Sequence, residues 1–184
     1  MSEIVLGVTG SIAAYKAAEL TRSLVKAGHA VSVVMTRAAT KFVTPLTFRT
    51  LSRRHVAIGI FDPVAEWDPR HVSLARRAEV LVVAPCSADT IAKLANGLAD
   101  DELSATALAC RAPLVIAPAM NDAMYDHPAT RANLATLRAR GAIIVEPAVG
   151  ELACGSEGRG RLAPLEKILA AIEDALARNA GNRQ

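Results

Sequence analysis

The sequence predicts a single α/β domain in which helices cover both faces of a doubly wound parallel sheet. Short apolar runs rich in valine, isoleucine and leucine alternate with longer segments in which apolar residues recur at helical spacing. Continuous apolar runs are typical of strands buried on both faces of a parallel sheet, and their alternation with helices favours strand–helix–strand units. The 184 residues have the length of one domain. We expect residues 1–179 to form this domain and residues 180–184 to form a frayed tail.

The first half of the chain predicts three buried strands joined by helices. Gly28 follows the first helix where a left-handed cap is favoured, and Pro85 should end the third strand because it has no N–H for the ladder. Residues 61–70 predict a loop, since they contain two Asp-Pro turn signals. The strands are expected at Ile4–Val8, Ala30–Met35 and Val80–Ala84, and Val56–Ile58 could form another short one. The helices are expected at Ile12–Ala27, Ala38–Val43, Thr44–Ser52 (a helix or a turn), Val72–Ala78 with its start at His71, Ser87–Ala95 and Asp101–Cys110.

The second half of the chain continues the alternation. Leu114–Ala117 predicts a fourth buried strand, which Pro118 is expected to end. Proline is favoured at the first position of a helix and glycine after its last, so Pro128 and Gly141 bracket a helix. Ala148–Arg161 is rich in glycine, and we expect it to be a mobile loop. The remaining expected elements are the helices Pro128–Arg140 and Pro164–Arg178 and a fifth major strand at Ala142–Val145.

The composition excludes several classes of protein. Hydrophobic residues make up 52% of the chain and aromatic residues 3%, which predicts an aliphatic core. The net charge is only +3 and the arginines are scattered, so no nucleic-acid partner is indicated. The apolar runs are too short to span a bilayer, and no signal peptide is evident. The 3 cysteines are distant from one another, which fits a reducing cytoplasm and argues against disulfides and a metal site.

Small polar residues follow three of the predicted strands. Ser11 follows the first strand, Ser87 the third, and Asn121 the fourth. Ligands of open α/β sheets bind at the carboxyl ends of the strands, so these side chains predict a binding site. Each residue taken alone could simply cap a helix. The three together favour a ligand.

The turn after the first strand is suited to a phosphate. Gly10 allows close approach of the backbone, and Ser11 adds a hydroxyl at the start of a helix, where N–H groups are available. The dinucleotide pattern G-x-G-x-x-G is absent, because Gly7, Gly10 and Ala13 occupy its positions. Thr36, not an acidic residue, follows the second strand. This pattern favours a mononucleotide over a dinucleotide.

Two other residues are candidates for proton transfer. His71 begins a helix after a loop, although a lone histidine is more often structural than catalytic. Cys154 lies among glycines with two arginines nearby, where a thiol could be reactive or act as an acid, on a loop that could close over a substrate. Cys86 and Cys110 are expected to be small core residues.

These motifs resemble those of the homo-oligomeric flavin-containing cysteine decarboxylases. The resemblance covers nearly the whole chain, and the motifs around Asn121 and Cys154 are its most specific parts. It implies a flavodoxin-like or Rossmann-like three-layer sandwich. Within the family, the motifs are most similar to those of the members that convert 4′-phosphopantothenoylcysteine to 4′-phosphopantetheine in coenzyme A synthesis. The motifs are Gly10-Ser11-Ile12-Ala13-Ala14-Tyr15-Lys16, His71, Pro85–Thr90, Pro118-Ala119-Met120-Asn121 with Met124, and Ala153-Cys154-Gly155 with Gly158 and Gly160.

The resemblance also implies roles for individual residues. His71, Asn121 and Cys154 would be catalytic, and Asn121 would bind the substrate carboxylate with Met120 and Met124. Lys16 and Arg161 are further candidates. Residues that would hold FMN are Gly10, Ser11, Ile12, Thr36, Ser87, Ala88, Asp89, Thr90 and Ala119. The sequence departs from the common family pattern at Asp89 (often Asn), Tyr125 (often Trp) and Leu162 (often Met).

The implied chemistry explains why a flavin is needed. Oxidation of the substrate's CH2–SH group to a thioaldehyde places the carboxylate β to a C=S bond, so CO2 can leave with its electrons delocalised onto sulfur as an enethiolate. Reduced flavin and a proton from Cys154 would complete the product. The resemblance implies trimers or trimers of trimers with FMN at subunit interfaces, and a phosphopantothenoylcysteine synthase domain as a partner. The competing interpretations are a flavin prenyltransferase, a peptidyl-cysteine decarboxylase, or a non-enzymatic flavin-binding regulator.

Overall fold

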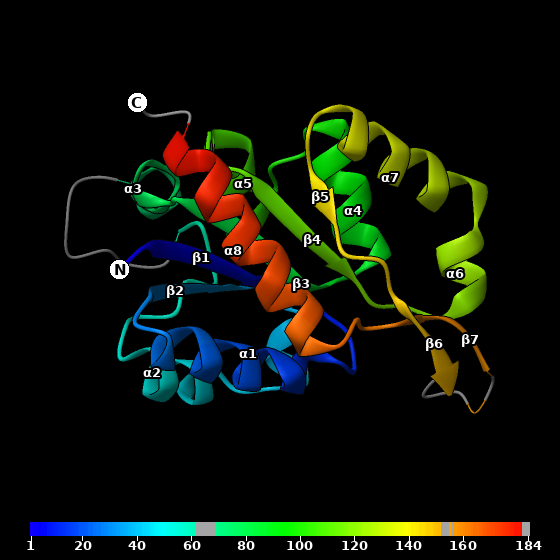
Figure 1. Ribbon diagram of the computed structural model, residues 1–184, viewed down its shortest axis with the longest axis horizontal. Coiled ribbons are helices and arrows are strands. Elements are labelled where there is room, and N and C mark those ends of the chain that lie inside the picture. The colour runs from blue at the N-terminus through cyan, green and yellow to red at the C-terminus, as the bar shows by residue number, and fades with distance from the viewer. Residues whose placement is uncertain (62–68, 152–154, 156, 182–184) are drawn as a thin grey trace.

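Five parallel strands form the centre of the protein, in the order β2-β1-β3-β4-β5 (Figure 1). The computed structural model describes residues 1–61, 69–151, 155 and 157–181. This strand order is that of the flavodoxin-like doubly wound sheet, so the predicted fold class is confirmed. The strands are β1 (Glu3–Val8), β2 (Ala30–Met35), β3 (Val80–Cys86), β4 (Leu114–Pro118) and β5 (Ile143–Ile144).

Helices cover both faces of the sheet. Side chains alternate along β1, so that Leu6 packs into the core on one face and Val5 into the core on the other. The first face is covered by α1 (Ala14–Lys26), α2 (Pro45–Ser52) and α8 (Leu165–Gly181). The second face is covered by α3 (Arg70–Arg77), α4 (Ala88–Asn96), α5 (Glu102–Ala109) and α7 (Pro128–Ala139). The shorter helices are η1 (Ala39–Lys41) and α6 (Asp122–Asp126).

Most predicted elements are present, with shifted ends. The β2 strand has the predicted bounds, whereas α1 begins at Ala14, two residues later than expected, because Ile12 and Ala13 lie in the turn. The expected strand at Val56–Ile58 is reduced to one bridge between Ala57 and Val34. The expected fifth major strand is wrong in length, since β5 has two residues. The α8 helix continues through Gly181, beyond the expected start of the tail.

Two prolines that we expected to end strands are themselves the last or next-to-last residues of those strands. The β3 strand includes Pro85 and ends at Cys86, and β4 includes Pro118. Proline lacks a donor but keeps its carbonyl, and Pro85 O accepts the N–H of Thr9 at 3.3 Å. Cys86 is paired with Pro118 after an irregularity in the register of β3 and β4. Pro118 is thus the last residue of β4, as expected, whereas the expectation that Pro85 ends β3 is wrong by one residue.

The glycine-rich segment is an antiparallel hairpin in the part that the structure describes. It consists of β6 (Ala148–Glu151) and β7 (Glu157–Arg161), with Gly150 opposite Gly158. The expected mobile loop is therefore wrong for these residues, because their backbones are paired. Residues 152–154 and 156, which include Cys154, lie outside the described residues.

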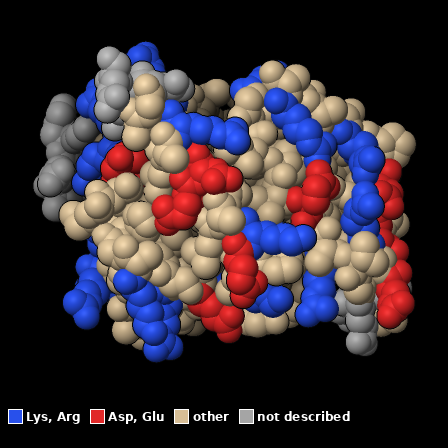
Figure 2. Space-filling model, viewed as in Figure 1, with Lys and Arg blue, Asp and Glu red and all other residues tan. Residues whose placement is uncertain are grey.

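The surface shows no segregation of charge on the face seen in Figure 2, where basic and acidic side chains are interspersed. Among the helices described by the structure, none has the length and apolar character that crossing a bilayer requires.

Candidate active site

Two adjoining cavities lie at the carboxyl ends of the strands. Their volumes are about 610 and 670 Å³, and both are lined by Gly10, Ser87, Ala88 and Met124. The first cavity is also lined by Ser11, Ile12, Ala13, Tyr15, Lys16, Phe42, Ala119, Met120, Asn121, Gly160, Arg161 and Leu162. The second is also lined by Thr36, Arg37, Ala38, Ile58, Gly59, Ile60, Phe61, Asp89, Thr90, Lys93, Asp100 and Asp101. All the residues expected to hold FMN therefore line one cavity or both.

The loops after β1 and β2 are in direct contact at the edge of these cavities. A Cβ atom at Gly10 would lie 2.5 Å from the Cβ of Ala38, so a larger residue would separate the loops. The N–H of Thr36 also donates to Val8 O at 3.0 Å. Glycine is thus required here for close packing of two loops, in addition to any contact with a ligand.

The two serines of the site organise the backbone around them. The Oγ of Ser11 accepts the N–H of Ala13 at 3.3 Å. The Oγ of Ser87 accepts the N–H of Thr90 at 3.3 Å and lies 3.2 Å from its hydroxyl, so Ser87 caps α4. The capping interpretation is correct for Ser87, yet both serines also line the first cavity. Ser87 and Ala88 both line the first cavity, so the start of α4 adjoins it, and a helix start offers N–H groups that suit an anion.

Asp89 has an ionic partner that the sequence did not reveal. Its carboxylate lies 3.3 Å from Lys93 Nζ, which is also 3.2 Å from Asp100 and 3.4 Å from Asp101. Burial alone would lower the pKa of Lys93, but hydrogen bonds and charge from these carboxylates raise it to about 12. Asp89 therefore carries a compensated negative charge at a position where the family often has a neutral amide.

Asn121 serves as the cap of α6. Its Oδ1 accepts the N–H groups of Ala123 at 3.0 Å and Met124 at 3.4 Å. The interpretation of Asn121 as a helix cap is therefore correct for its Oδ1 atom. The side chain also lines the first cavity, together with Met120. Because the cap holds the oxygen, the plane of the amide is held as well, and its NH2 group is the part suited to a carboxylate.

The β6–β7 hairpin packs tightly on the loop that carries Asn121. The N–H of Met120 donates to Gly160 O at 3.0 Å, and a Cβ atom at Gly160 would collide with Met120 O. A Cβ atom at Gly158 would lie 2.6 Å from the Cβ of Asp122. The Gly158-x-Gly160 spacing therefore permits the backbones to meet.

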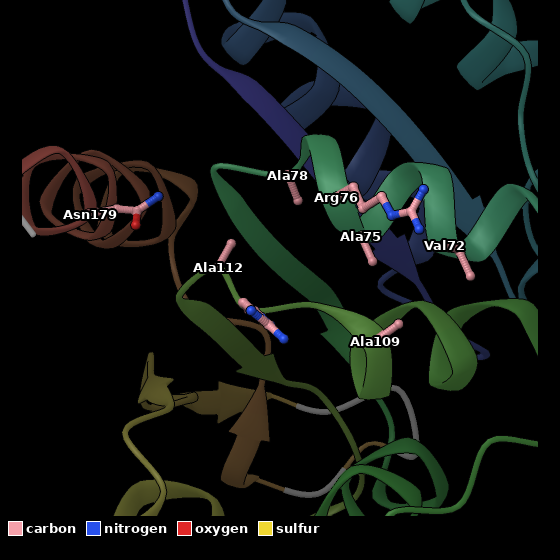
Figure 3. A pocket seen from close by; sticks show the side chains of 8 residues that line it. Val72, Ala75, Arg76, Ala78, Ala109, Ala112 and Asn179 are labelled. Carbon is pink, nitrogen blue, oxygen red and sulfur yellow. The ribbon is translucent and has the colours of Figure 1, made fainter. Parts of the chain in front are cut away.

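His71 differs from the residues expected to hold FMN, all of which line a strand-end cavity. It lines neither strand-end cavity, and its Nδ1 is buried with no hydrogen-bond partner among the described residues. The next residue, Val72, lines a different cavity of about 550 Å³ between α3, α5 and α8, where Ala75 of α3 lies opposite Ala109 of α5 (Figure 3). One chain thus brings Asn121 and the expected FMN-binding residues together, but not His71.

Sequence reasoning missed several residues of the site. Phe42 lines the first cavity and is half exposed, as is Tyr15. Thr9 is 1% exposed and hydrogen-bonds to the loop after β3. Lys16 and Arg161, which the sequence offered as further candidates, both line the first cavity.

Cys86 is buried as expected, which raises the pKa of its thiol, and Cys110 is partly buried. Within the described ranges, no three His, Cys, Asp or Glu side chains cluster as a metal site would require.

The fold and the paired cavities define a class of protein. The first cavity has apolar walls, hydroxyl groups at helix starts and two cations, with no carboxylate among its described lining residues. These features fit a flat, phosphate-bearing mononucleotide. Residues 1–177 match the model of the Flavoprotein family, and the chain belongs to that family. Family membership supports the expected flavin cofactor.

The chain is similar to named proteins over nearly all of its length. It is 47% identical over 175 residues to the coenzyme A biosynthesis bifunctional protein CoaBC of Vibrio cholerae, covering 95% of this chain and 44% of that protein. Identity to CoaBC of Bacillus subtilis is 47% over 174 residues, covering 95% and 43%. The chain therefore spans less than half the length of these curated relatives.

Solved structures extend the similarity to the fold. The FMN-dependent cysteine decarboxylase SpaF has a TM-score of 0.83 and 32% identity, with 98% of each chain covered. A cysteine-to-serine mutant of PPC decarboxylase complexed with pantothenoylaminoethenethiol has a TM-score of 0.82 and 29% identity, with 94% of this chain and 96% of that chain covered.

Proposed function

We propose that this chain is an FMN-dependent phosphopantothenoylcysteine decarboxylase, which converts 4′-phosphopantothenoylcysteine to 4′-phosphopantetheine in coenzyme A biosynthesis. The single observation that carries the proposal is the first strand-end cavity. It brings Ser11, Ser87, Ala119 and Asn121 together from three different strand ends. The names of the CoaBC relatives and of the PPC decarboxylase structure support this substrate.

The cofactor would be held by residues that already surround the two cavities. When bound, FMN would accept two electrons from the substrate's CH2–SH group and later return them. The capped start of α4 and the Ser11 turn offer N–H and hydroxyl donors, and Lys16 offers a positive charge. The residues that would hold FMN are Gly10, Ser11, Ile12, Thr36, Ser87, Ala88, Asp89, Thr90 and Ala119.

The substrate carboxylate would lie beside Asn121. The cap on α6 holds the amide in one orientation, and Met120 and Met124 give apolar surface on either side. A carboxylate surrounded by apolar surface loses its hydration, which favours departure of neutral CO2. Cys154 would then donate the proton that completes the product.

The complete site would be formed by more than one copy of the chain. His71 lines neither cavity, so a single chain does not bring it to Asn121. A trimer, or trimers of trimers, with FMN at the interfaces would bring His71 of one copy to the cavity of another. We expect a phosphopantothenoylcysteine synthase domain as a further partner, because the relatives are named bifunctional.

Mixing two inactive variants tests this shared site. Trimers reassembled from equal amounts of His71→Asn and Asn121→Asp chains should regain about a quarter of the wild-type activity, because that fraction of interfaces has both native residues. No recovery from trimers that contain both variants would contradict a site shared between subunits.

A second activity is supported by one observation. The 32% identity to the FMN-dependent cysteine decarboxylase SpaF extends over 98% of the chain. This similarity favours, as the competing reaction, the decarboxylation of a C-terminal peptidyl cysteine that the family resemblance also allows. Turnover of phosphopantothenoylcysteine would also argue against a flavin prenyltransferase and would exclude a non-enzymatic flavin-binding regulator.

The substrate is tested by offering the FMN-loaded protein three compounds separately. We expect phosphopantothenoylcysteine to lose CO2, as followed by mass spectrometry, while a peptide with C-terminal cysteine and dimethylallyl phosphate remain unchanged. Turnover of only the peptide or only dimethylallyl phosphate would contradict the proposal.

The role of Cys154 is tested by the Cys154→Ser variant, which should keep its yellow FMN and stop at the oxidised enethiol product. Full activity of this variant would contradict the role of Cys154.

A further inference from the structure

Thr9 connects the ends of two neighbouring strands through its side chain. Its hydroxyl donates to Pro85 O at 2.8 Å and accepts the N–H of Ser87 at 2.9 Å. The backbone N–H of Thr9 also donates to Pro85 O, at 3.3 Å. The residue is 1% exposed, so these bonds are shielded from water. Both the donor and an acceptor site of the hydroxyl are therefore used within the protein.

A side chain completes the connection beyond the paired part of β1 and β3. Their register ends at Gly7 and Val83, and past this point the backbone contact is the bond from Thr9 N–H to Pro85 O. The N–H of Ser87 finds its acceptor in the side-chain hydroxyl of Thr9 and not in a backbone carbonyl. Without it, a buried N–H would have no partner, which is costly.

The other connections between these loops are formed by backbone atoms. The N–H of Ala119 donates to Cys86 O at 3.1 Å, that of Thr36 to Val8 O at 3.0 Å, and that of Met120 to Gly160 O at 3.0 Å. A substitution leaves such bonds largely intact. The connection through Thr9 is different because it depends on the chemical identity of one side chain.

The residue held by Thr9 is central to the site. Ser87 lines both strand-end cavities and caps α4, whose first turn contains three of the expected FMN-binding residues. Thr9 itself lines neither cavity, so it can act only through the position of Ser87. The β1 turn that follows Thr9 contains Gly10 and Ser11, which are tied to it by the Ser11 N–H to Thr9 O bond of 2.9 Å.

We infer that Thr9 is a positioning residue for the cofactor. It holds the Ser87 backbone in register with the Gly10-Ser11 turn, so that the two halves of the FMN site are aligned before the cofactor binds. This inference rests on the proposed function for the identity of the ligand, but not for the connection between the loops. Pre-alignment lowers the ordering cost of binding and thus increases affinity.

The test compares four proteins by FMN fluorescence titration. Thr9→Val keeps the shape and removes the hydroxyl, and we expect it to weaken FMN binding about tenfold or more, since a buried N–H loses its partner. Thr9→Ser keeps the hydroxyl and should remain within about threefold of the wild type. Thr21→Val is the matched control, because Thr21 is fully buried and its hydroxyl donates to Ala17 O at 2.7 Å within α1.

Equal FMN affinity in the Thr9→Val variant and the wild type would overturn the inference. So would an equal loss of affinity in Thr21→Val, because the effect would then follow general destabilisation. If Thr9→Val does not fold, Thr9→Ala takes its place, with the same expected loss and the same rescue by serine.

A second readout separates this inference from the proposed function. Hydrogen exchange of the Ser87 amide, measured without any ligand, should be slow in the wild type and in Thr9→Ser and much faster in Thr9→Val. A wild type that binds no FMN would contradict the proposed function. In that case, faster exchange in Thr9→Val still supports the connection between the loops, and unchanged exchange overturns it.

Discussion

The two edges of the central sheet use their polar side chains differently. At the amino edge, Glu3 accepts from Ser32 Oγ at 3.1 Å and from Arg54, and its N–H donates to Glu79 at 2.9 Å. Asn179 donates to Glu79 O at 2.8 Å. These side chains come from distant parts of the sequence, and they connect those parts to one another.

At the carboxyl edge, polar side chains mostly bond to the backbone of nearby loops. Ser87 and Asn121 cap helices and also line the first cavity. The hydroxyl of Thr9 bonds to the backbone of the loop after β3. Polar groups at the amino edge therefore stabilise the fold, whereas those at the carboxyl edge shape a surface for a ligand. The two edges belong to the same sheet and differ in the bonding partners of their polar side chains, which are distant segments at the amino edge and nearby loop backbone at the carboxyl edge. It follows that substitutions at one edge should change stability and those at the other should change binding and turnover.

The largest effect at the carboxyl edge is expected from Gly160→Ala. The new Cβ would collide with Met120 O, so the hairpin must move away from the Asn121 loop. We expect kcat/KM to fall by about 100-fold, because displacement of catalytic groups by about 1 Å has effects of this size. FMN binding should be nearly unchanged. The matched control is Gly181→Ala, where an added Cβ meets no atom within 4 Å, and its kcat/KM should equal that of the wild type.

A similar loss of turnover without loss of stability is expected from Asn121→Asp. A carboxylate can still accept the N–H groups of Ala123 and Met124, so the cap on α6 is kept. It cannot donate to the substrate carboxylate, and it repels it. We expect kcat/KM to fall about 100-fold, as when one well-placed donor is removed, with a melting temperature close to that of the wild type. A large fall in melting temperature with normal turnover would reverse the assignment of this residue.

The amino edge should respond in the opposite way. Arg54→Met removes the charged partner of Glu3 and should lower the free energy of unfolding by about 1 kcal/mol, a modest value because the Arg54 side chain is 38% exposed. Urea denaturation measures this loss, and FMN titration should give an unchanged affinity. Weakened FMN binding in this variant would show that the two edges are not independent.

The smallest effect concerns the pH dependence at Lys93. Neighbouring carboxylates outweigh the effect of burial and raise the pKa of Lys93 from 10.5 to about 12. The resulting stability is fully present below pH 10.5 and is lost as the pH rises through about 12, because the charged form is favoured in the folded state. The Asp89→Asn variant should show a shallower loss over this range in alkaline denaturation. An identical pH profile would indicate that the Asp89–Lys93 pair contributes nothing to stability.

Much of the fold follows from local sequence patterns. The β2 strand has its expected bounds because its apolar run is uninterrupted, and the strand-end position of Ser87 and Asn121 follows from the alternation of strands and helices. The hairpin was not predicted, because the reason for its glycines is a contact with Met120 and Asp122, far away in the sequence.

The contacts of Thr9 and the position of His71 outside both cavity linings could not be predicted for a related reason. The hydroxyl of Thr9 matters only once it is known which residues of the loop after β3 lie beside it. Whether His71 lines a cavity depends on where α3 packs, and a helical pattern does not specify that. Local patterns therefore identify the residues of the site, while tertiary packing decides how they are held.

The central claim is that the carboxyl edge of this sheet is built to hold FMN. Titration of the purified, flavin-free protein with FMN, followed by quenching of flavin fluorescence, tests it most directly. We expect saturable binding of one FMN per chain, weakened by Thr9→Val and unaffected by Arg54→Met. Failure of the wild-type protein to bind FMN, or equal weakening by both substitutions, would contradict the account.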